Sequence, residues 1–148
     1  MIFRIVADCR FQGDSFSPRL AERKTGLTFV KKNERGEIGR IGRHVGTPIP
    51  YGSCSLRAPS EAKTSSVYAG LDWLLDTLDE EKLRLILECG AVDPVLFLGV
   101  FYDGQCNFEF NQVQLTKIAK LNVALAISCY EVRPDDEPSL QNEKGVTH

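Results

Sequence analysis

The residues with the strongest chemical signature form one glycine-rich, basic stretch, ERGEIGRIGRHVGTPIPYG, at residues 34–52. A phosphate-binding P-loop places a lysine and then a serine or threonine after its glycines, between a strand and a helix. This stretch has no such pair, and its TPIPYG end is unsuited to opening a helix. Its glycines also lack the G-x-G-x-x-G spacing of a dinucleotide-binding turn. The spacing therefore does not predict a nucleotide site.

The same part of the chain is basic enough to contact an anion. Residues 31–50 hold five basic and two acidic residues, a net charge of +3. Such a patch can neutralise phosphates, although charged runs are most often solvated surface. A long connection without regular structure is uncommon and often functional. We therefore expect a long, mobile loop with a role in binding, whose candidate contact residues are Arg35, Arg40, Arg43 and His44.

Side chains suited to catalysis or metal binding do not form a recognisable set. His44 could in principle serve as a base for the thiol of Cys9 or Cys54, but nothing in the spacing brings them together. The five cysteines are widely spaced, and most lie among apolar residues. They are expected to be reduced, structural thiols rather than zinc ligands. We interpret the protein as a non-enzyme without metal or cofactor.

A second candidate surface lies on a leucine-rich helical segment. An apolar stripe at helical spacing runs through residues 67–78, and Trp73 falls more than a third of a turn away from it. Residues 72–88 hold six acidic and two basic residues, a net charge of −4. Trp73 either packs against a neighbouring element or anchors a partner, since tryptophan is enriched in interface hot spots. An acidic face would suit a basic partner, with Asp72, Asp76 and Glu80 as contacts.

The elements that must position these residues follow an α+β pattern. Alternation over 3–11 predicts a half-buried strand. Ser17, Pro18 and Gly26 are suited to the N-cap, the first position and the stop of a helix over 18–25. A second strand is expected at 51–58. The long helical signal begins near residue 64 or 65 and resumes after Asp79, as one kinked helix or two.

The C-terminal half predicts a hairpin, a helix and a last strand. Residues 95–102 are apolar on both faces, as in a central strand, and an Asp-Gly turn leads to a strand at 106–110. Asn111 and Gln114 form a capping box for the next helix, and a strand follows at 123–132. The order β-α-β-α-β-β-α-β predicts a ferredoxin-like-related sheet of about five mainly antiparallel strands, with helices on one face.

Composition limits the classes of protein that remain. The chain has 148 residues and a net charge of −2, which argues against a general nucleic-acid binder. It has neither a membrane-length apolar run nor a secretory signal at its start, so we expect a cytoplasmic protein. One domain over 1–132 and an acidic, disordered tail over 133–148 are expected. Sheets of this kind can also pair edge to edge as a homodimer.

The succession of these segments resembles a known family. The opening strand, SPRLAERKTGL, the Gly/Arg loop, the leucine-rich helix and the closing GQCNFEFNQVQLTKIAKLNVALAISCYE are similar to the bacterial domain-of-unknown-function family numbered four-two-seven-nine, over residues 2–132. Tyr51 stands where that family often has tryptophan. Some members resemble neighbours of toxin genes, which implies an immunity protein that binds a cognate toxin. The alternative is a nucleic-acid- or anion-binding regulator that uses the basic loop.

Overall fold

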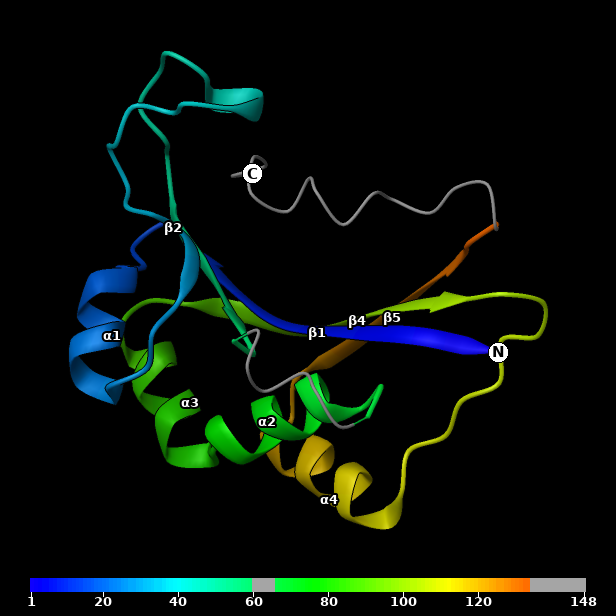
Figure 1. Ribbon diagram of the computed structural model, residues 1–148. Coiled ribbons are helices and arrows are strands. Elements are labelled where there is room, and N and C mark those ends of the chain that lie inside the picture. The colour runs from blue at the N-terminus through cyan, green and yellow to red at the C-terminus, as the bar shows by residue number, and fades with distance from the viewer. Residues whose placement is uncertain (60–65, 134–148) are drawn as a thin grey trace.

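The computed structural model describes residues 1–59 and 66–133, and this part of the chain forms one five-stranded sheet and four helices (Figure 1). The strands lie in the order β2-β3-β1-β4-β5. The strands are β1 (Ile2–Gly13), β2 (Val30–Asn33), β3 (Gly52–Arg57), β4 (Val92–Tyr102) and β5 (Ala124–Glu131). The helices are α1 (Pro18–Thr25), α2 (Ala69–Thr77), α3 (Glu80–Glu88) and α4 (Gln112–Leu121), with a 3₁₀ turn, η1 (Gly42–His44).

The helices all cover one face of the sheet, as Figure 1 shows. Alternate residues of the two central strands point into this layer, because successive side chains of a strand face opposite ways. The core between sheet and helices is built from β1, β4 and the inner faces of α2 and α3, with Ile5, Ala7, Cys9, Phe11, Leu96, Leu98, Val100, Leu71, Leu74 and Ile86 all buried. The α+β class, the five strands and the one-sided helices are therefore confirmed.

Local capping signals fix the helix ends where the sequence predicts them. The Ser17 side chain accepts a hydrogen bond from the Leu20 amide (3.3 Å), and Gly26 ends α1 with φ of 73°. Asn111 and Gln114 form the predicted capping box at the start of α4. Each device involves residues within a few positions of one another, so each could be read from sequence.

The two-helix alternative is correct for the leucine-rich segment. Leu78 has an extended backbone at the end of α2, and the Asp79 carboxylate caps α3 by accepting from the Lys82 amide (2.8 Å). The predicted helix start at 64 or 65 lies outside the described residues. Within the described residues, α2 begins at Ala69. The predicted tail lies outside them from residue 134 onward. No helix in the described ranges is both long and apolar enough to cross a membrane.

The strand order differs from the predicted one. Residues 30–33, expected to be loop, form β2 and pair with β3 at one sheet edge. Residues 106–110, expected to be a strand, do not form one. The place beside β4 is taken by β5, which runs parallel to it with Val95 opposite Ala124, so the sheet is mixed and a ferredoxin-like order is not confirmed.

The chain after the Asp-Gly turn packs on the side of the sheet that the helices cover. Gly104 has φ of 72° and turns the chain as predicted. Beyond it, Phe108 and Phe110 pack against the core. The Tyr68 hydroxyl holds this segment by accepting a hydrogen bond from the Glu109 amide (3.1 Å). α4 then supplies the crossover that a parallel connection between β4 and β5 requires.

Candidate functional site

Residues 34–51 form an arm that connects β2 to β3. Figure 1 shows the arm, in cyan and teal, extending on the side of the sheet opposite the helices. Backbone hydrogen bonds join its two sides, from Gly36 to Ile49 (2.8 Å) and from Gly39 to Thr47 (2.9 Å). The Gly46 amide closes the end by donating to the Gly39 carbonyl (2.9 Å). The segment expected to be an irregular loop is therefore a hydrogen-bonded arm.

The glycines of this arm serve its backbone geometry. A Cβ atom on Gly39 would lie 2.1 Å from the carbonyl oxygen of His44, so only glycine allows the two sides to cross this closely. Gly42 and Gly46 have φ of 73° and 75°, in the left-handed region that favours glycine. These turns and this close approach explain the glycine spacing of the arm.

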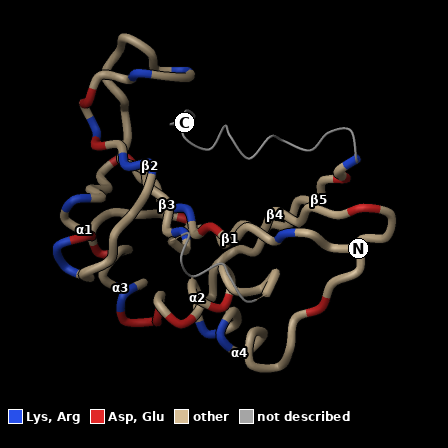
Figure 2. Tube along the Cα trace, in the orientation of Figure 1, with Lys and Arg blue, Asp and Glu red and all other residues tan. Residues whose placement is uncertain are grey.

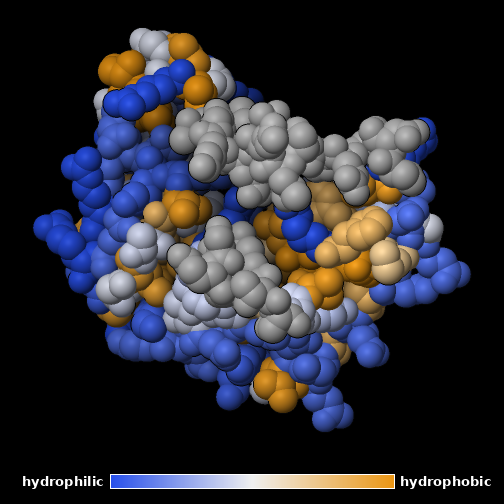
Figure 3. Space-filling model, in the orientation of Figure 1, coloured by the Kyte–Doolittle hydropathy of each residue, from blue (hydrophilic) through white to orange (hydrophobic). Residues whose placement is uncertain are grey.

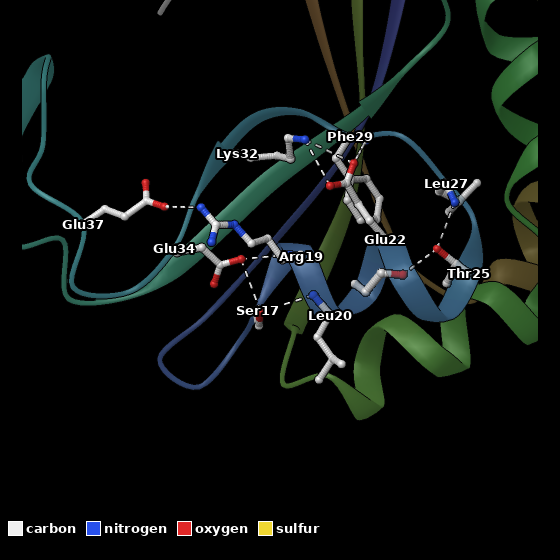
Figure 4. Close-up of polar contacts among 11 residues, drawn as sticks. Ser17, Arg19, Leu20, Glu22, Thr25, Leu27, Phe29, Lys32, Glu34 and Glu37 are labelled. Atoms are coloured by element: carbon white, nitrogen blue, oxygen red, sulfur yellow. Dashed lines mark hydrogen bonds and ion pairs between the residues drawn. The ribbon is translucent and has the colours of Figure 1, made fainter.

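The base of the arm is held to α1 and the start of β2 by acidic side chains (Figure 4). The Glu34 carboxylate accepts from the Ser17 hydroxyl (3.2 Å) and the Arg19 amide (2.8 Å). Arg19 also pairs with Glu37 (3.7 Å). In the same region Glu22 pairs with Lys32 (3.0 Å). The carboxylates of this region therefore fix where the arm leaves the body.

The outer part of the arm carries exposed apolar and cationic side chains. Ile38, Ile41 and Val45 are 58%, 52% and 56% exposed. Arg40 and Arg43 are exposed beside them, and neither forms an ion pair within the described ranges. Figure 3 shows apolar and strongly hydrophilic surface side by side at this end of the molecule. Apolar groups with arginine are characteristic of protein interfaces.

The sheet face that the helices leave uncovered, called here the open face, carries an aromatic cluster. A Cβ atom on Gly99 would lie 3.6–3.7 Å from the rings of Phe97, Phe101 and Tyr130, so the three rings surround this glycine. The Phe101 and Tyr130 rings stack with centroids 5.1 Å apart. The Arg4 guanidinium lies 4.5 Å from the centroid of Phe101, a cation–π arrangement.

An acidic group completes the charge pattern on the open face. Asp8 is 2% exposed and accepts two hydrogen bonds from Arg57, at 2.6 and 2.7 Å. The hydrogen bond with Asp8 raises the pKa of Arg57 above its usual value. Arg10 lies 3.8 Å from Asp8 and 4.2 Å from the centroid of the Phe97 ring. The open face is thus an ordered set of arginines, rings and one buried carboxylate.

These open-face residues were missed by the reasoning from sequence. The available signal was the alternation of side chains along two strands. Arg4, Asp8 and Arg10 share one face of β1, and Phe97 and Phe101 share one face of β4. Their pairing across strands is visible only in the register, where Arg4 lies opposite Phe101 and Asp8 opposite Phe97.

The structure places three of the four predicted residues of the leucine-rich segment, Trp73, Asp72 and Asp76, in contacts within the molecule. Trp73 is half-buried and packs against the core. Asp72 accepts from the Gln114 side chain (2.8 Å), and Asp76 pairs with Lys117, so both bind α4. Glu80 is exposed in the first turn of α3. Figure 2 shows this acidic region at the α2–α3 junction, well apart from the basic positions of the arm.

The arm residues predicted from sequence have separate surroundings. Arg35 donates to the Asp14 carbonyl (3.3 Å) at the base, whereas Arg40 and Arg43 lie farther out. His44 packs edge-on against Tyr51, with ring centroids 5.7 Å apart. The structure therefore brings Arg40, Arg43 and the exposed aliphatic residues together on the arm, and leaves the acidic helix elsewhere.

The thiols named as potential nucleophiles lie inside the core. Burial, and secondarily the charge of Asp8, raises the pKa of Cys9 to about 12. Burial likewise raises the pKa of Cys54. Such thiols stay protonated at neutral pH and are poor nucleophiles. In the described part of the chain, no three histidine, cysteine or acidic residues gather in a way that could hold a metal ion.

The fold and this surface define a small α+β protein with a one-sided mixed sheet and an exposed, hydrogen-bonded arm. No protein-family model, curated protein or solved structure matches the chain. The family resemblance drawn from the sequence stays a prediction.

Proposed function

We propose that this is a non-enzymatic protein-binding protein whose arm contacts a partner, and more specifically an immunity-type protein that neutralises a cognate bacterial toxin by direct binding. The observation that carries the proposal is the exposure of Ile38, Ile41 and Val45 on an arm with its own hydrogen bonds. Branched aliphatic side chains at a projecting end add nothing to the core, and their burial in a partner would be favourable.

The arm suits binding for a second reason, its preorganisation. Ordering a free loop on association costs conformational entropy, and a segment already held by hydrogen bonds loses less. The contacts of Glu34 and Glu37 with α1 fix the base from which the arm extends. A partner with an apolar pocket rimmed by carboxylates would fit the aliphatic residues together with Arg40 and Arg43.

The test is binding of the purified protein to the product of the adjacent gene, measured by calorimetry and by rescue from toxicity on co-expression. The triple variant Ile38→Ser, Ile41→Ser, Val45→Ser should weaken affinity by roughly tenfold to a thousandfold, as hot-spot truncations do. Val113→Ser is the matched control, because Val113 is 62% exposed but lies on α4. Full affinity in the triple variant, or equal loss in the control, would contradict the proposal.

The acidic helix is the other candidate contact and can be separated from the arm in the same assay. Asp76→Lys and Glu80→Lys invert charge on α2 and α3 without touching the arm. Since Asp76 is already paired with Lys117, we expect both variants to bind as the native protein does. A large loss of affinity here, with the arm variant unaffected, would move the contact to the helix.

A nucleic-acid- or anion-binding regulator is the second candidate, favoured by Arg40 and Arg43, which are exposed and form no ion pair with any residue that the structure describes. Fluorescence anisotropy with labelled single-stranded DNA and RNA tests it. Binding through phosphates should fall steeply as salt rises from ~50 to ~200 mM. Absence of binding at the lower salt concentration removes this candidate, whereas steep salt dependence lost in Arg40→Ala, Arg43→Ala would support it.

A further inference from the structure

The two edges of the sheet differ in how they are protected against pairing with another strand. β2 forms one edge and β5 forms the other. An edge strand presents backbone N–H and C=O groups without partners, and proteins usually shield it by a short length, lysines or a bulge. β2 has all three, because it spans only Val30–Asn33, contains Lys31 and Lys32, and pairs with β3 in an irregular register. This edge is therefore unsuited to accepting a further strand.

The β5 edge lacks this protection. β5 is eight residues long and pairs with β4 in an unbroken register from Ala124 to Glu131. Its residues 124–130, ALAISCY, include neither a charged residue nor a proline. Leu125 and Ile127 are both 40% exposed, and Tyr130 is 46% exposed. Among the described residues no strand pairs with the outer side of β5, so this edge combines free backbone groups with exposed apolar side chains.

The backbone groups on the outer side of β5 follow from one hydrogen bond just beyond the strand. The Val132 amide donates to the Tyr102 carbonyl at the end of β4 (2.8 Å). Backbone groups alternate between the two edges of a strand, so the amides of Ser128 and Tyr130 point toward β4 as that of Val132 does. The residues whose N–H and C=O groups point away from β4 are then Leu125, Ile127, Cys129 and Glu131.

We propose that β5 is the interface of a homodimer, in which the β5 strands of two copies pair antiparallel about a two-fold axis at Ile127. A two-fold axis perpendicular to a strand generates antiparallel pairing, and each copy then offers the same edge to the other. The outward backbone groups of the two strands bond to each other, and the two five-stranded sheets become one continuous sheet.

The side chains of β5 fit this register. On the open face, Tyr130 of each copy lies opposite Ala124 of the other, so a large ring meets a small residue. On the other face, Leu125 of one copy lies opposite Cys129 of the other, and the two Ile127 side chains meet at the axis. Cross-strand pairs of this kind stabilise a sheet, and the exposed aliphatic side chains of both copies lose contact with water.

The charges at the two ends of β5 also favour a second copy in this orientation. Glu131 is exposed at the end of β5, and Lys120 is exposed in the last turn of α4, shortly before β5 begins. Antiparallel pairing places Glu131 of each copy at the end of the interface that follows Lys120 of the other. Pairing in the same direction would instead place Glu131 beside Glu131 and Arg133 beside Arg133, which is unfavourable.

The homodimer leaves both arms free. The arm connects β2 to β3, and β2 lies at the edge of the sheet opposite β5. A dimer joined through β5 therefore presents one arm at each of its outer ends. Dimerisation through β5 goes beyond the proposed function and does not depend on it.

Sedimentation velocity of the full chain from ~5 to ~500 µM tests the proposal. Two paired strands bury less surface than a standard interface, so we expect a reversible shift from the 16.5 kDa monomer toward twice that mass. Ile127→Lys places two like charges at the axis and should weaken association by at least roughly tenfold. Leu87→Lys is the matched control and should associate as the native chain does, because Leu87 is 41% exposed but lies on α3.

Hydrogen exchange of the native chain at the two ends of this concentration range identifies the edge. The amides of Ile127 and Cys129 should exchange slowly only in the dimer, whereas that of Ser128, which is bonded to β4, should be slow in both states. This measurement needs no variant, so it holds even where Ile127→Lys fails to fold.

Four results would each overturn the homodimer. They are a monomer at every concentration, undiminished association of a folded Ile127→Lys chain, equal loss in Leu87→Lys, and exchange at Ile127 that does not change on dimerisation. Protection of these amides only after another protein is added would assign the edge to that protein instead. The experiments contain no toxin and leave the arm intact, so their failure is distinct from failure of the proposed function.

Discussion

The buried carboxylate of Asp8 depends on one neighbouring residue for most of its compensation. Arg57 donates both of its short hydrogen bonds, and Arg10 is farther away at 3.8 Å. A buried charge left without a partner is much more costly than the same charge in water. This pair therefore stabilises the open face in a way that surface ion pairs elsewhere on the molecule do not.

Replacing Arg57 with methionine should lower the free energy of unfolding by about 2–3 kcal/mol, since Asp8 then keeps its burial but loses its main donors. Urea unfolding followed by circular dichroism measures the loss. Arg84→Met is the control: Arg84 pairs with both Glu81 and Glu88, but all three are exposed, so a much smaller loss than that of Arg57→Met is expected. Equal losses would contradict the role given to burial.

The buried thiol of Cys9 predicts a loss of stability in alkali. Burial raises its pKa from 9.0 to about 12. Because the folded-state pKa is above the unfolded one, the contribution is complete below pH 9.0 and is lost as pH rises toward about 12. In that window the free energy of unfolding should fall by up to about 1.4 kcal/mol per pH unit.

Urea titrations of the native chain and of Cys9→Ala across this pH range isolate the effect of the thiol. Other groups that titrate in alkali contribute to both proteins, so the quantity of interest is the difference between the two curves. The curves should converge as pH rises, since the variant lacks the thiol. Parallel curves would show that Cys9 does not contribute.

At the scale of elements, the arm is a structure within one connection. Its two sides pair with each other, and its base is bonded to α1. Few of its residues reach the core; Ile49 is buried, whereas Ile38, Ile41 and Val45 are not. The arm can therefore be disrupted with little effect on global unfolding.

Gly39→Ala should disrupt the arm selectively, because the new Cβ would lie 2.1 Å from the His44 carbonyl oxygen. We expect faster hydrogen exchange at the amides of Gly46 and Ile49, weaker partner binding and a nearly unchanged urea midpoint. Gly42→Ala is the control: its φ of 73° costs roughly 1 kcal/mol, but nothing lies within 4 Å of its Cβ position. Native exchange rates in Gly39→Ala would contradict the crossing described for the arm.

The strand order shows where local signals stop being sufficient. An Asp-Gly turn after an apolar strand predicts a hairpin, and the turn does form at Gly104. The returning segment nevertheless leaves the sheet. The edge of β4 is occupied by β5, which pairs with it over the whole length of β5, from Ala124 to Glu131. A pairing between strands separated by a helix is a long-range contact, which a turn motif does not report.

At the scale of the whole molecule, the arm and the open face lie on the side of the sheet away from the helices (Figure 1). On the helix side, Asp72 and Asp76 are used in contacts with α4. The surface proposed to meet a partner therefore lies on the opposite side of a two-layered molecule. The arginines on this side of the sheet contrast with the net charge of −2 of the whole chain.

Binding through this side should show separate electrostatic and apolar contributions. Arg40→Ala, Arg43→Ala should slow association with the partner, with the difference from the native protein shrinking as salt rises. The aliphatic triple variant should mainly speed dissociation, since short-range packing acts after encounter. Surface plasmon resonance at two salt concentrations measures both rates. Equal, salt-independent effects of the two variants on the association rate would contradict this division.

The sequence by itself determined the caps of α1 and α4, the inward residues of β1 and the N-cap at Asp79, because capping and alternation act over a few neighbouring positions. Only the tertiary structure decided the parallel pairing of β5 with β4, the ring cluster around Gly99 and the hydrogen-bonded form of the arm. Each of these joins residues whose neighbourhood depends on which strands pair and in what register. That choice is made by the packing of the whole sheet against its helices.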